Sequence, residues 1–425
     1  MALPEKNWLP FHLSVACRRQ LPSRGAFGKE FPKRMKAIVN TKIVTENGMI
    51  WDGVILFENG TILTADWADQ VTIPENAEII DAKGLYAAPG FIDIHCHGGP
   101  DGAWDINPEA AALHHLTHGT TTILPAIGYS RTLEEMLEGK ARIQEASKSG
   151  AARIVKGLYM EGPYMSTRSS GQKYVKWTGP IVPEEYVPLV QGMKGYAKVW
   201  AIDPARDGVE PFMQYLRQED PEAIFAHGHS KATFAQCRKF RKYGVKVQTH
   251  FNDSGQAPGR AQGTAGAGCD HYSLHEPDIY AELICDTCGI HVDADLIKTL
   301  VRTKGVDRVI LITDYCTRKN DFKNNEEEGI LYGPDLNYDY QGHLNGSCLS
   351  MDCAVRNLMK HTAYGLCHAV QMGSLNAARM LGIDDEVGSL EAGKKANILL
   401  MDDMVNIKRI YFEGEPVVED GKYCG

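Results

Sequence analysis

The amino-acid sequence predicts an α/β fold in which a (β/α)8 barrel is joined to a small β-sandwich domain. The barrel is predicted from residues 89–382, where apolar runs alternate with amphipathic segments in the manner of parallel βα units. This stretch of roughly 290 residues is the usual size of one TIM-like barrel. The sandwich is predicted from short strand patterns at 35–88 that return at 383–425, so both chain ends build one domain.

Residues 1–34 precede the first strand pattern and differ in composition from the rest. They contain seven Lys or Arg against two Glu, together with Pro and Gly, and they have no continuous apolar core. A secretory signal needs such a core. We expect a leader or extension ahead of Met35, with a transit peptide as the alternative.

The predicted elements follow one another in a simple order along the chain. The first sandwich strands are separated by turn signals, among them Asn-Gly at 47–48 and at 59–60. In the barrel, the strand-like run TTILPAI is followed by the amphipathic segment LEEMLEGKARIQEAS and then by the strand-like RIVKGLYMEG. After residue 382, ANILLMDD and IKRIYFEGEPV return to the strand pattern.

Composition excludes several classes of protein. The chain has 45 basic and 54 acidic residues and a formal net charge of -9, so it lacks the cationic field that holds nucleic acid or acidic lipid. No apolar run is long enough to span a membrane. Its eleven cysteines are scattered without the dense spacing of a secreted disulfide scaffold. We therefore expect a cytoplasmic protein with reduced thiols.

The predicted barrel strands end on residues that can bind metal. In the run FIDIHCHGG, side chains alternate between two faces, so His95 and His97 point the same way. Barrel enzymes carry their reactive groups at the carboxyl ends of the strands. The groups that follow the apolar runs are His95, His97, Glu161, His229, His250 and Asp314.

This set of side chains predicts a metal centre with hydrolytic chemistry. A divalent metal held by imidazole and carboxylate ligands lowers the pKa of a bound water toward neutrality. Glu161, His229 and His250 can form one site, and His95 and His97 can complete a second one with Glu161 as the bridge. Asp314 can accept the proton of the water and pass it to the leaving group. Taken one at a time, each residue also fits an ordinary polar residue at a strand end.

The motifs as a set resemble those of the amidohydrolase superfamily and, within it, the N-acetylglucosamine-6-phosphate deacetylases. The resemblance covers about residues 36 to 415 and is most specific in the Glu-Gly-Pro, Gly-His-Ser and Gly-Ser-x-Leu-x-Met-Asp segments. The segments that carry it are APGFIDIHCHGG, HGTTTILP, LYMEGPYM, HGHSKAT, THFND, CGIHV, LITD, LNGSCLSMD and GSLEAGKKANILL.

The resemblance implies roles for individual residues. It makes Glu161, His229 and His250 the ligands of the principal metal and Asp314 the catalytic acid and base. It assigns His291 to the amide carbonyl as a catalytic residue, with one or two metals per subunit. Zn²⁺ is preferred, but Fe, Mn or Co suits such ligands as well. The residues that it assigns to substrate binding are Asn252, Arg260, Leu344 and Ser347, with Arg260 on the sugar phosphate; it also implies a homodimer.

Three departures from the family pattern fall on the predicted substrate loops. Lys173 stands where the family usually has a His that contacts the substrate, so we expect Lys173 to bind substrate at this position. A lysine is a point charge that does not share a proton near pH 7 as an imidazole does. The second metal histidine is followed by FND, one residue shorter than usual. CDTCGIHV is longer than the usual segment. None of these three departures changes a predicted metal ligand.

The sequence thus predicts a metal-dependent enzyme that removes the acetyl group from an N-acetylated amino-sugar phosphate, with N-acetylglucosamine 6-phosphate as the first choice. Its partners are then a small-molecule substrate and a second subunit, without nucleic acid or membrane. An alternative is an amidohydrolase for another N-acyl amino sugar, of the galacto series or unphosphorylated, or for a cyclic amide. A third reading is an inactive barrel that serves as a binding scaffold.

Overall fold

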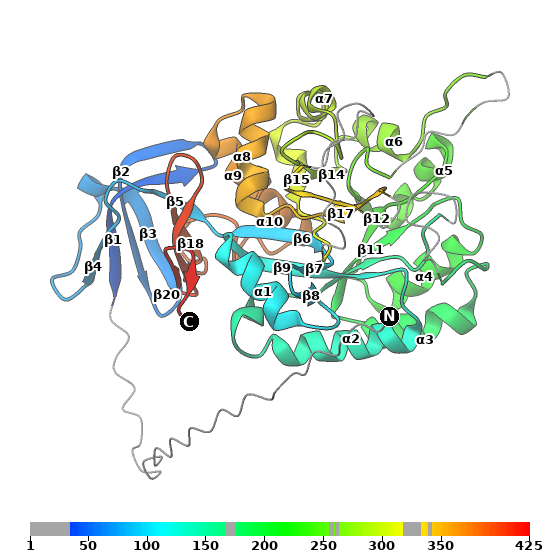
Figure 1. Ribbon diagram of the computed structural model, residues 1–425, viewed down its shortest axis with the longest axis horizontal. Coiled ribbons are helices and arrows are strands. Elements are labelled where there is room, and N and C mark those ends of the chain that lie inside the picture. Colours follow the sequence, from blue (N-terminus) through cyan, green and yellow to red (C-terminus); the bar gives the residue numbers. More distant parts are fainter. Residues whose placement is uncertain (1–34, 167–175, 255–258, 260–262, 318–332, 339–341) are drawn as a thin grey trace, which may run out of the picture. The chain divides into compact units, whose positions relative to one another are not determined.

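The computed structural model of the protein describes residues 35–166, 176–254, 259, 263–317, 333–338 and 342–425 (Figure 1). Eight strands form one parallel sheet in the order β15-β14-β13-β12-β11-β10-β9-β6. The ends of this order are joined, because the backbone N–H of Asp314 donates to the carbonyl oxygen of His95 at 2.9 Å. The strands are β6 (Phe91–Cys96), β9 (Thr120–Gly128), β10 (Leu158–Glu161), β11 (Ala197–Ile202), β12 (Ile224–His227), β13 (Val245–Gln248), β14 (Tyr280–Ile284) and β15 (Val309–Ile312).

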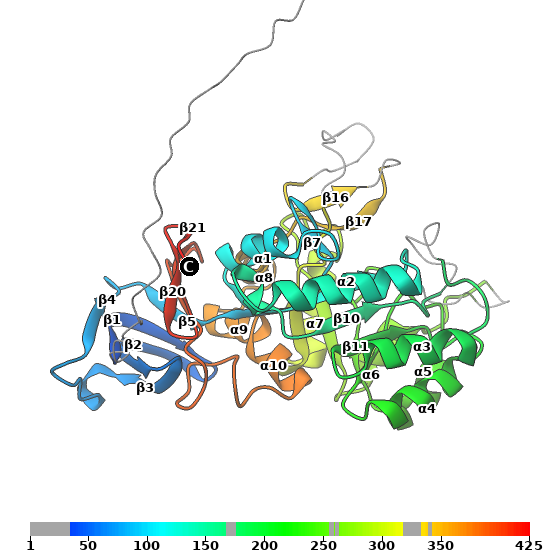
Figure 2. The ribbon, with the colours of Figure 1, turned by 90° about the horizontal axis from the view of Figure 1, so that it is seen from below.

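Helices surround this barrel (Figures 1 and 2). The longer helices bury an apolar face; in α4, for example, Val209, Phe212, Met213 and Leu216 are buried at helical spacing. The helices are α1 (Pro108–Thr117), α2 (Leu133–Ala146), α3 (Pro183–Met193), α4 (Val209–Glu219), α5 (Phe234–Lys239), α6 (Cys269–His275), α7 (Ala294–Lys304), α8 (Met351–Thr362), α9 (Leu366–Met372) and α10 (Leu375–Leu381). Short 3-10 turns are η1 (Ala68–Gln70), η2 (Ala151–Ile154), η4 (Arg241–Tyr243) and η5 (Val306–Arg308).

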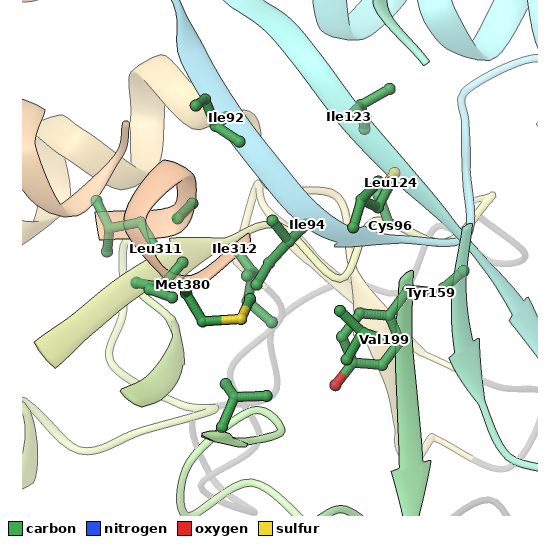
Figure 3. Close-up of a cluster of buried hydrophobic side chains, with 14 of the residues drawn as sticks. Ile92, Ile94, Cys96, Ile123, Leu124, Tyr159, Val199, Leu311, Ile312 and Met380 are labelled. Atoms are coloured by element: carbon green, nitrogen blue, oxygen red, sulfur yellow. The ribbon is translucent and has the colours of Figure 1, made fainter. Parts of the chain in front are cut away.

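The layer between strands and helices is filled with apolar side chains. Figure 3 shows Met380 of α10 beside Ile94 of β6 and Ile312 of β15. All three are fully or almost fully buried. Burying such a side chain contributes about 1.5–3 kcal/mol. This packing holds β6 and β15 next to each other, and both strands end at candidate site residues.

The second lobe is a nine-stranded sheet to which both chain ends contribute. Its central pairing joins β5 and β18, which run antiparallel, with Ala88 opposite Leu399. Arg379 of α10 ties the lobe to the barrel through a two-pronged ion pair with Glu46, at 2.6 and 2.9 Å. The strands are β1 (Lys36–Thr45), β2 (Gly48–Glu58), β3 (Thr61–Trp67), β4 (Glu78–Asp81), β5 (Tyr86–Pro89), β18 (Ile398–Met401), β19 (Ile407–Phe412), β20 (Glu415–Glu419) and β21 (Lys422–Tyr423).

The predicted fold class is confirmed: a (β/α)8 barrel with a β-lobe built from both ends of the chain. Two small hairpins flank the barrel, β7 (Gly98–Gly99) with β8 (Gly102–Ala103), and β16 (Leu336–Tyr338) with β17 (Leu344–Ser347). Within the described residues, none of the helices combines the length and the apolar character that a membrane crossing requires.

One buried histidine of α1 makes stability depend on pH. Burial lowers the pKa of His115 from its ordinary value of 6.5 to about 4, against the opposing hydrogen bond to the carbonyl of Gly98. Below pH 6.5 the unfolded chain therefore binds a proton that the folded chain does not. The free energy of unfolding falls as the pH drops from 6.5 toward 4, by about 3 kcal/mol for this group.

We expect His115→Gln to flatten this dependence, because Gln does not titrate and can still donate to Gly98. Urea unfolding of the metal-free wild type and variant at pH 6.5 and pH 4.5 measures the two slopes. Equal losses of stability in both proteins would show that His115 does not carry the effect. A lower stability of the variant at both pH values leaves the comparison of slopes intact.

Candidate metal centre

Six ionisable side chains meet at the carboxyl ends of the barrel strands. His95 and His97 come from the end of β6, Glu161 is the last residue of β10, and the others follow β12, β13 and β15. All six are buried except His97, which is half-buried. The set consists of His95, His97, Glu161, His229, His250 and Asp314.

Glu161 lies at the centre of this group. Its Oε1 is 2.8 Å from Nε2 of His229 and 3.0 Å from Nε2 of His250. Its Oε2 is 3.0 Å from Nε2 of His97. One carboxylate therefore touches three imidazoles that come from three different strand ends.

His95 and Asp314 complete the cluster. Oδ1 of Asp314 lies 3.2 Å from Nε2 of His97 and 3.7 Å from Nε2 of His95. Neither Nε2 of His95 nor Oδ1 of Asp314 has a hydrogen-bond partner among the described residues, although both atoms are buried. Buried polar atoms rarely remain unpaired. These two atoms thus point to a bound species.

The backbone turns sharply at three of these residues. His229, His250 and Asp314 have φ values of 43, 23 and 47°. A side chain with a Cβ rarely adopts the left-handed region, and such strain of about 1–3 kcal/mol per residue concentrates at functional sites. Here the turn occurs just after β12, β13 and β15. It lets the residue leave the strand direction at the point where its side chain joins the cluster.

A second layer of polar groups orients the imidazoles. Oε2 of Glu282, in β14, accepts a hydrogen bond from Nδ1 of His95 at 3.2 Å and another from the backbone N–H of His250 at 3.1 Å. The hydroxyl of Ser254 lies 3.1 Å from Nδ1 of His250. When Nδ1 of an imidazole is engaged in this way, its Nε2 is left to bind a metal.

The electrostatics of the cluster favour positive charge at its centre. Burial alone would raise the pKa of Glu161, but the charges of His229 and His97 and hydrogen bonds from the imidazoles hold it well below its usual range. Burial opposes the charged form of the imidazoles as well. Hydrogen bonds and charge interactions with the carboxylates nevertheless raise the pKa of His95 and of His97 to about 10 and that of His250 to about 9.

The donor set fits a divalent metal. The Nε2 atoms of His229 and His250 face each other at 3.1 Å, and a metal ion can satisfy both nitrogens together with Glu161. Two groups that contain Glu161 have all their ligand atoms within 4.8 Å of one another: Glu161 with His229 and His250, and Glu161 with His95 and His97. Imidazole and carboxylate ligands suit Zn²⁺ and other divalent transition metals.

We expect Glu282→Gln to weaken metal binding by about 10–100-fold, as replacing such an orienting carboxylate usually does. The amide keeps the size of the side chain but reduces the negative charge that holds Nδ1–H of His95. Competition with a metallochromic chelator measures the affinity. Glu222→Gln, on the surface between α4 and β12, is the matched control. Equal affinities in all three proteins would remove Glu282 from the site.

His291 lies beside the cluster and is oriented by a carboxylate. Its Nδ1 is 3.1 Å from Oδ1 of Asp253, whereas its Nε2 is buried without a partner in the described part of the chain. Hydrogen bonding to Asp253 raises the pKa of His291, although burial opposes this shift. Asp286 fixes the backbone here, because it accepts the N–H of His291 at 2.9 Å. The imidazole therefore has one free nitrogen that can reach a ligand.

A cavity of about 310 Å³ opens next to His97. Its size lies at the lower end of the range for small-molecule sites. Its wall combines Arg131, which Asp105 holds by an ion pair of 2.6 Å, with Asn345, Cys316 and Thr317. A small polar ligand can thus enter beside the metal ligands.

The predicted substrate-binding residues, unlike the candidate metal ligands, do not form one cluster in the described residues. Asn252 is exposed, and its backbone N–H donates to Asp270 at 3.0 Å. Leu344 begins β17, whereas the hydroxyl of Ser347 donates to the carbonyl of Thr313 and thereby supports the turn that carries Asp314. Arg260 and Lys173 lie outside the described residues.

Sequence reasoning missed the second layer. Glu282 stands inside the apolar run YAELI, and an acidic residue within a buried strand was the available signal. The alternation of side chains in FIDIHCHGG also puts Asp93 on the face of His95 and His97, although the sequence gives Asp93 no role of its own. It accepts the hydroxyl of Thr313 at 2.6 Å and so links β6 to the residue before Asp314.

The chain is similar to known proteins in both sequence and structure. Residues 86–420 match the Amidohydrolase family. The chain is 28% identical to N-acetylgalactosamine-6-phosphate deacetylase of Escherichia coli O157:H7, covering 88% of this chain and 97% of that one. It is also 28% identical to N-acetylglucosamine-6-phosphate deacetylase of Bacillus subtilis strain 168, covering 86% and 92%. The crystal structure of N-acetylglucosamine-6-phosphate deacetylase from Pasteurella multocida superposes with a TM-score of 0.76 at 24% identity, over 90% of this chain and 99% of that one.

Proposed function

The chain belongs to the amidohydrolase family and, within it, to the N-acetylglucosamine-6-phosphate deacetylases, and we propose that it hydrolyses the acetamide of an N-acetylated amino-sugar 6-phosphate. The products are acetate and the free amino-sugar phosphate. The observation that carries this proposal is the contact of Glu161 with His97, His229 and His250, with Asp314 3.2 Å from His97. N-acetylglucosamine 6-phosphate is the first candidate substrate.

We assign the principal metal position to Glu161, His229 and His250, and a second position to His95 and His97 with Glu161 shared. The facing ring nitrogens of His229 and His250 and the unpaired Nε2 of His95 support this assignment. A divalent metal, when bound there, supplies a Lewis acid that polarises an amide carbonyl and lowers the pKa of water. Zn²⁺ is our first choice among Zn, Fe, Mn and Co.

Asp314 is the proposed general base and general acid. Its carboxylate lies beside the candidate ligands and has a buried oxygen without a partner in the described residues. In this position it can accept the proton of the attacking water and then deliver it to the departing amine. The backbone hydrogen bond from Asp314 to His95 fixes the carboxylate against the strand that carries the HxH pair.

His291 is proposed to donate from Nε2 to the acetyl carbonyl oxygen, where negative charge develops. Asp253 holds the opposite nitrogen at 3.1 Å and so directs Nε2 away from the loop. We assign Arg260 to the sugar phosphate, since a guanidinium fork matches phosphate oxygens. Lys173, Asn252, Leu344 and Ser347 remain proposals for substrate contacts.

A second candidate substrate is the galacto epimer. The relative from Escherichia coli O157:H7 that matches 88% of this chain is named as an N-acetylgalactosamine-6-phosphate deacetylase. The two sugars differ in the configuration of one hydroxyl. The residue that contacts this hydroxyl would decide between them.

The test is acetate release from the gluco and galacto N-acetylhexosamines, each with and without a 6-phosphate, by wild type and Arg260→Ala. We expect the wild type to prefer the phosphorylated sugars and the variant to lose about 10²-fold in kcat/KM on those alone, through KM, as the loss of a charged hydrogen-bond pair implies. Unchanged kcat/KM in the variant would show that Arg260 does not bind the phosphate. A wild type that releases no acetate from any of the four sugars would contradict the proposed function.

We also propose a homodimer in the cytoplasm. Eight cysteines in the described part of the chain, among them Cys96, Cys237, Cys269 and Cys285, are free thiols, which supports a reducing compartment. The dimer follows from the family resemblance alone. Light scattering of the purified protein measures the mass of the particle, and a monomer at working concentration would contradict the dimer.

A further inference from the structure

A second cluster of metal-binding side chains lies in the helix layer of the barrel. His227 is the last residue of β12, Cys237 lies in α5, and Cys269 is the first residue of α6. Figure 1 shows α5 and α6 on the same side of the barrel. The three residues are 1%, 0% and 2% exposed, and their ligand atoms lie within 4.8 Å of one another.

The cluster sits in an apolar pocket. Ala232, Tyr272 and Ile279 pack around the two cysteines. The ring of His227 lies 5.8 Å from that of Tyr272 in α6, so its side chain points to the helices rather than to the candidate metal centre. His227 and His229 are thus two residues apart in the sequence, but the side chain of His227 points to the helix layer and that of His229 to the candidate metal centre.

One polar atom of this cluster has no partner in the described part of the chain. Nε2 of His227 is buried without a hydrogen-bond partner in the described residues. The sulfur atoms of Cys237 and Cys269 are 2.9 Å apart, and each thiol is the other's neighbour. A buried nitrogen left unpaired costs about 1–3 kcal/mol. Such an atom needs an explanation, and a bound ion is one.

A comparable group lies beneath the HxH motif. Asp93, Cys96 and His115 also lie within 4.8 Å of one another. There, however, Nε2 of His115 donates to the carbonyl of Gly98 at 2.8 Å, and the sulfur of Cys96 accepts the indole N–H of Trp104 at 3.3 Å. Nδ1 of His115 is, like Nε2 of His227, buried without a partner in the described residues. The difference is that Cys96 already accepts a hydrogen bond from an indole, whereas the two thiols near His227 lie against each other.

We propose that His227, Cys237 and Cys269 form a second, thiolate-containing site for a soft divalent metal, for which Zn²⁺ is the physiological candidate. Two cysteines and one histidine are an established ligand set for Zn²⁺. On binding, the two thiol protons pass to solvent and two sulfur–metal bonds form. Two thiolates, a neutral imidazole and a divalent cation sum to zero charge. An apolar pocket tolerates this neutral group, whereas an isolated charge would be expelled.

The geometry requires only a small adjustment. Two sulfurs that bind one Zn²⁺ at about 2.3 Å in a tetrahedral arrangement lie about 3.8 Å apart. The present separation of 2.9 Å must therefore increase by roughly 1 Å. Rotation about the Cα–Cβ bond of either cysteine supplies such a movement.

A metal at this site would cross-link β12, α5 and α6 near the candidate metal centre. His227 precedes the metal ligand His229 by two residues. Cys269 stands next to Asp270, which accepts the backbone N–H of Asn252 in the segment that follows His250. A metal at this place joins β12, α5 and α6, and so positions both the strand end and the start of the substrate segment.

The test uses the full-length protein loaded with Zn²⁺ or with Co²⁺. We expect X-ray absorption at the zinc edge to show sulfur neighbours at about 2.3 Å from the metal. The ultraviolet-visible spectrum of the Co²⁺ protein should show a thiolate-to-cobalt charge-transfer band. In the double variant Cys237→Ser/Cys269→Ser, the band should vanish and the metal content should fall by one equivalent per chain. Cys285→Ser removes a buried thiol outside the cluster and should change neither readout.

The wild-type measurements alone decide the question if the double variant does not fold. A fully loaded wild type without sulfur neighbours would overturn the proposal, as would a band that Cys316→Ser, next to Asp314 and His97, abolishes. A disulfide between Cys237 and Cys269, found by mass spectrometry of protein purified without reductant or oxidant, would also overturn it.

Discussion

Replacing Asp314 by Asn is expected to lower kcat by about 10²–10⁴-fold, the usual contribution of a general acid and base. The amide matches the carboxylate in shape but cannot accept a proton. The backbone contacts of residue 314, from its N–H to His95 and from Ser347 to its carbonyl, do not depend on the side chain. The fold and the candidate ligands are therefore expected to remain in place.

The measurement is kcat and KM for acetate release, with metal content determined on the same sample. Asp295→Asn, on the exposed face of α7, is the matched control and should behave as wild type. If Asp314→Asn keeps its metal and turns over at the wild-type rate, Asp314 is not the proton carrier. If the variant loses its metal, Asp314 is instead one of the metal ligands. Its Oδ1 lies 3.2 Å from Nε2 of His97.

The strand-end argument explains why much of the site could be predicted. Parallel strands in a barrel bring their carboxyl ends to one face, so residues that follow apolar runs meet in space whatever their distance along the chain. Glu161 and His250 are 89 positions apart, and their side chains come within 3.0 Å. The family resemblance is confirmed by the match over residues 86–420. The domain boundaries at 88/89 and 382/383 remain a proposal.

The second layer could not be predicted in the same way, because it depends on side-chain direction inside the barrel. Glu282 lies within β14 rather than at its end, and only the closed sheet brings it to Nδ1 of His95. Residue type gives only a weak signal for the positive φ of His229, His250 and Asp314, because His and Asp are enriched in the left-handed region but still adopt it rarely. The role of Ser347 also depends on side-chain direction. It is predicted to line the substrate pocket, and in the structure its hydroxyl donates to the backbone carbonyl of Thr313.

Glu161→Gln is expected to have the largest effect, the loss of metal together with activity. Glu161 is the one carboxylate shared by both groups of candidate ligands in the described part of the chain. A neutral amide is a much weaker ligand than a carboxylate, and it withdraws the charge that raises the pKa of His95, His97 and His250. The metal held by this centre should fall below one tenth of its wild-type value, a loss of more than about 1.4 kcal/mol in binding, whereas the equivalent proposed at His227, Cys237 and Cys269 should remain.

Thermal unfolding separates this result from simple misfolding. Added Zn²⁺ stabilises a folded protein that binds it by RT ln(1 + [L]/Kd), about 2.7 kcal/mol at 100 times Kd. The wild type should therefore gain stability with Zn²⁺, and so should Glu184→Gln, an exposed control on α3. Glu161→Gln should unfold cooperatively without that gain from the principal centre. If the variant retains the full metal content and a kcat within tenfold of wild type, the metal must be held elsewhere, because a bridging carboxylate cannot be neutralised without weakening both positions it joins.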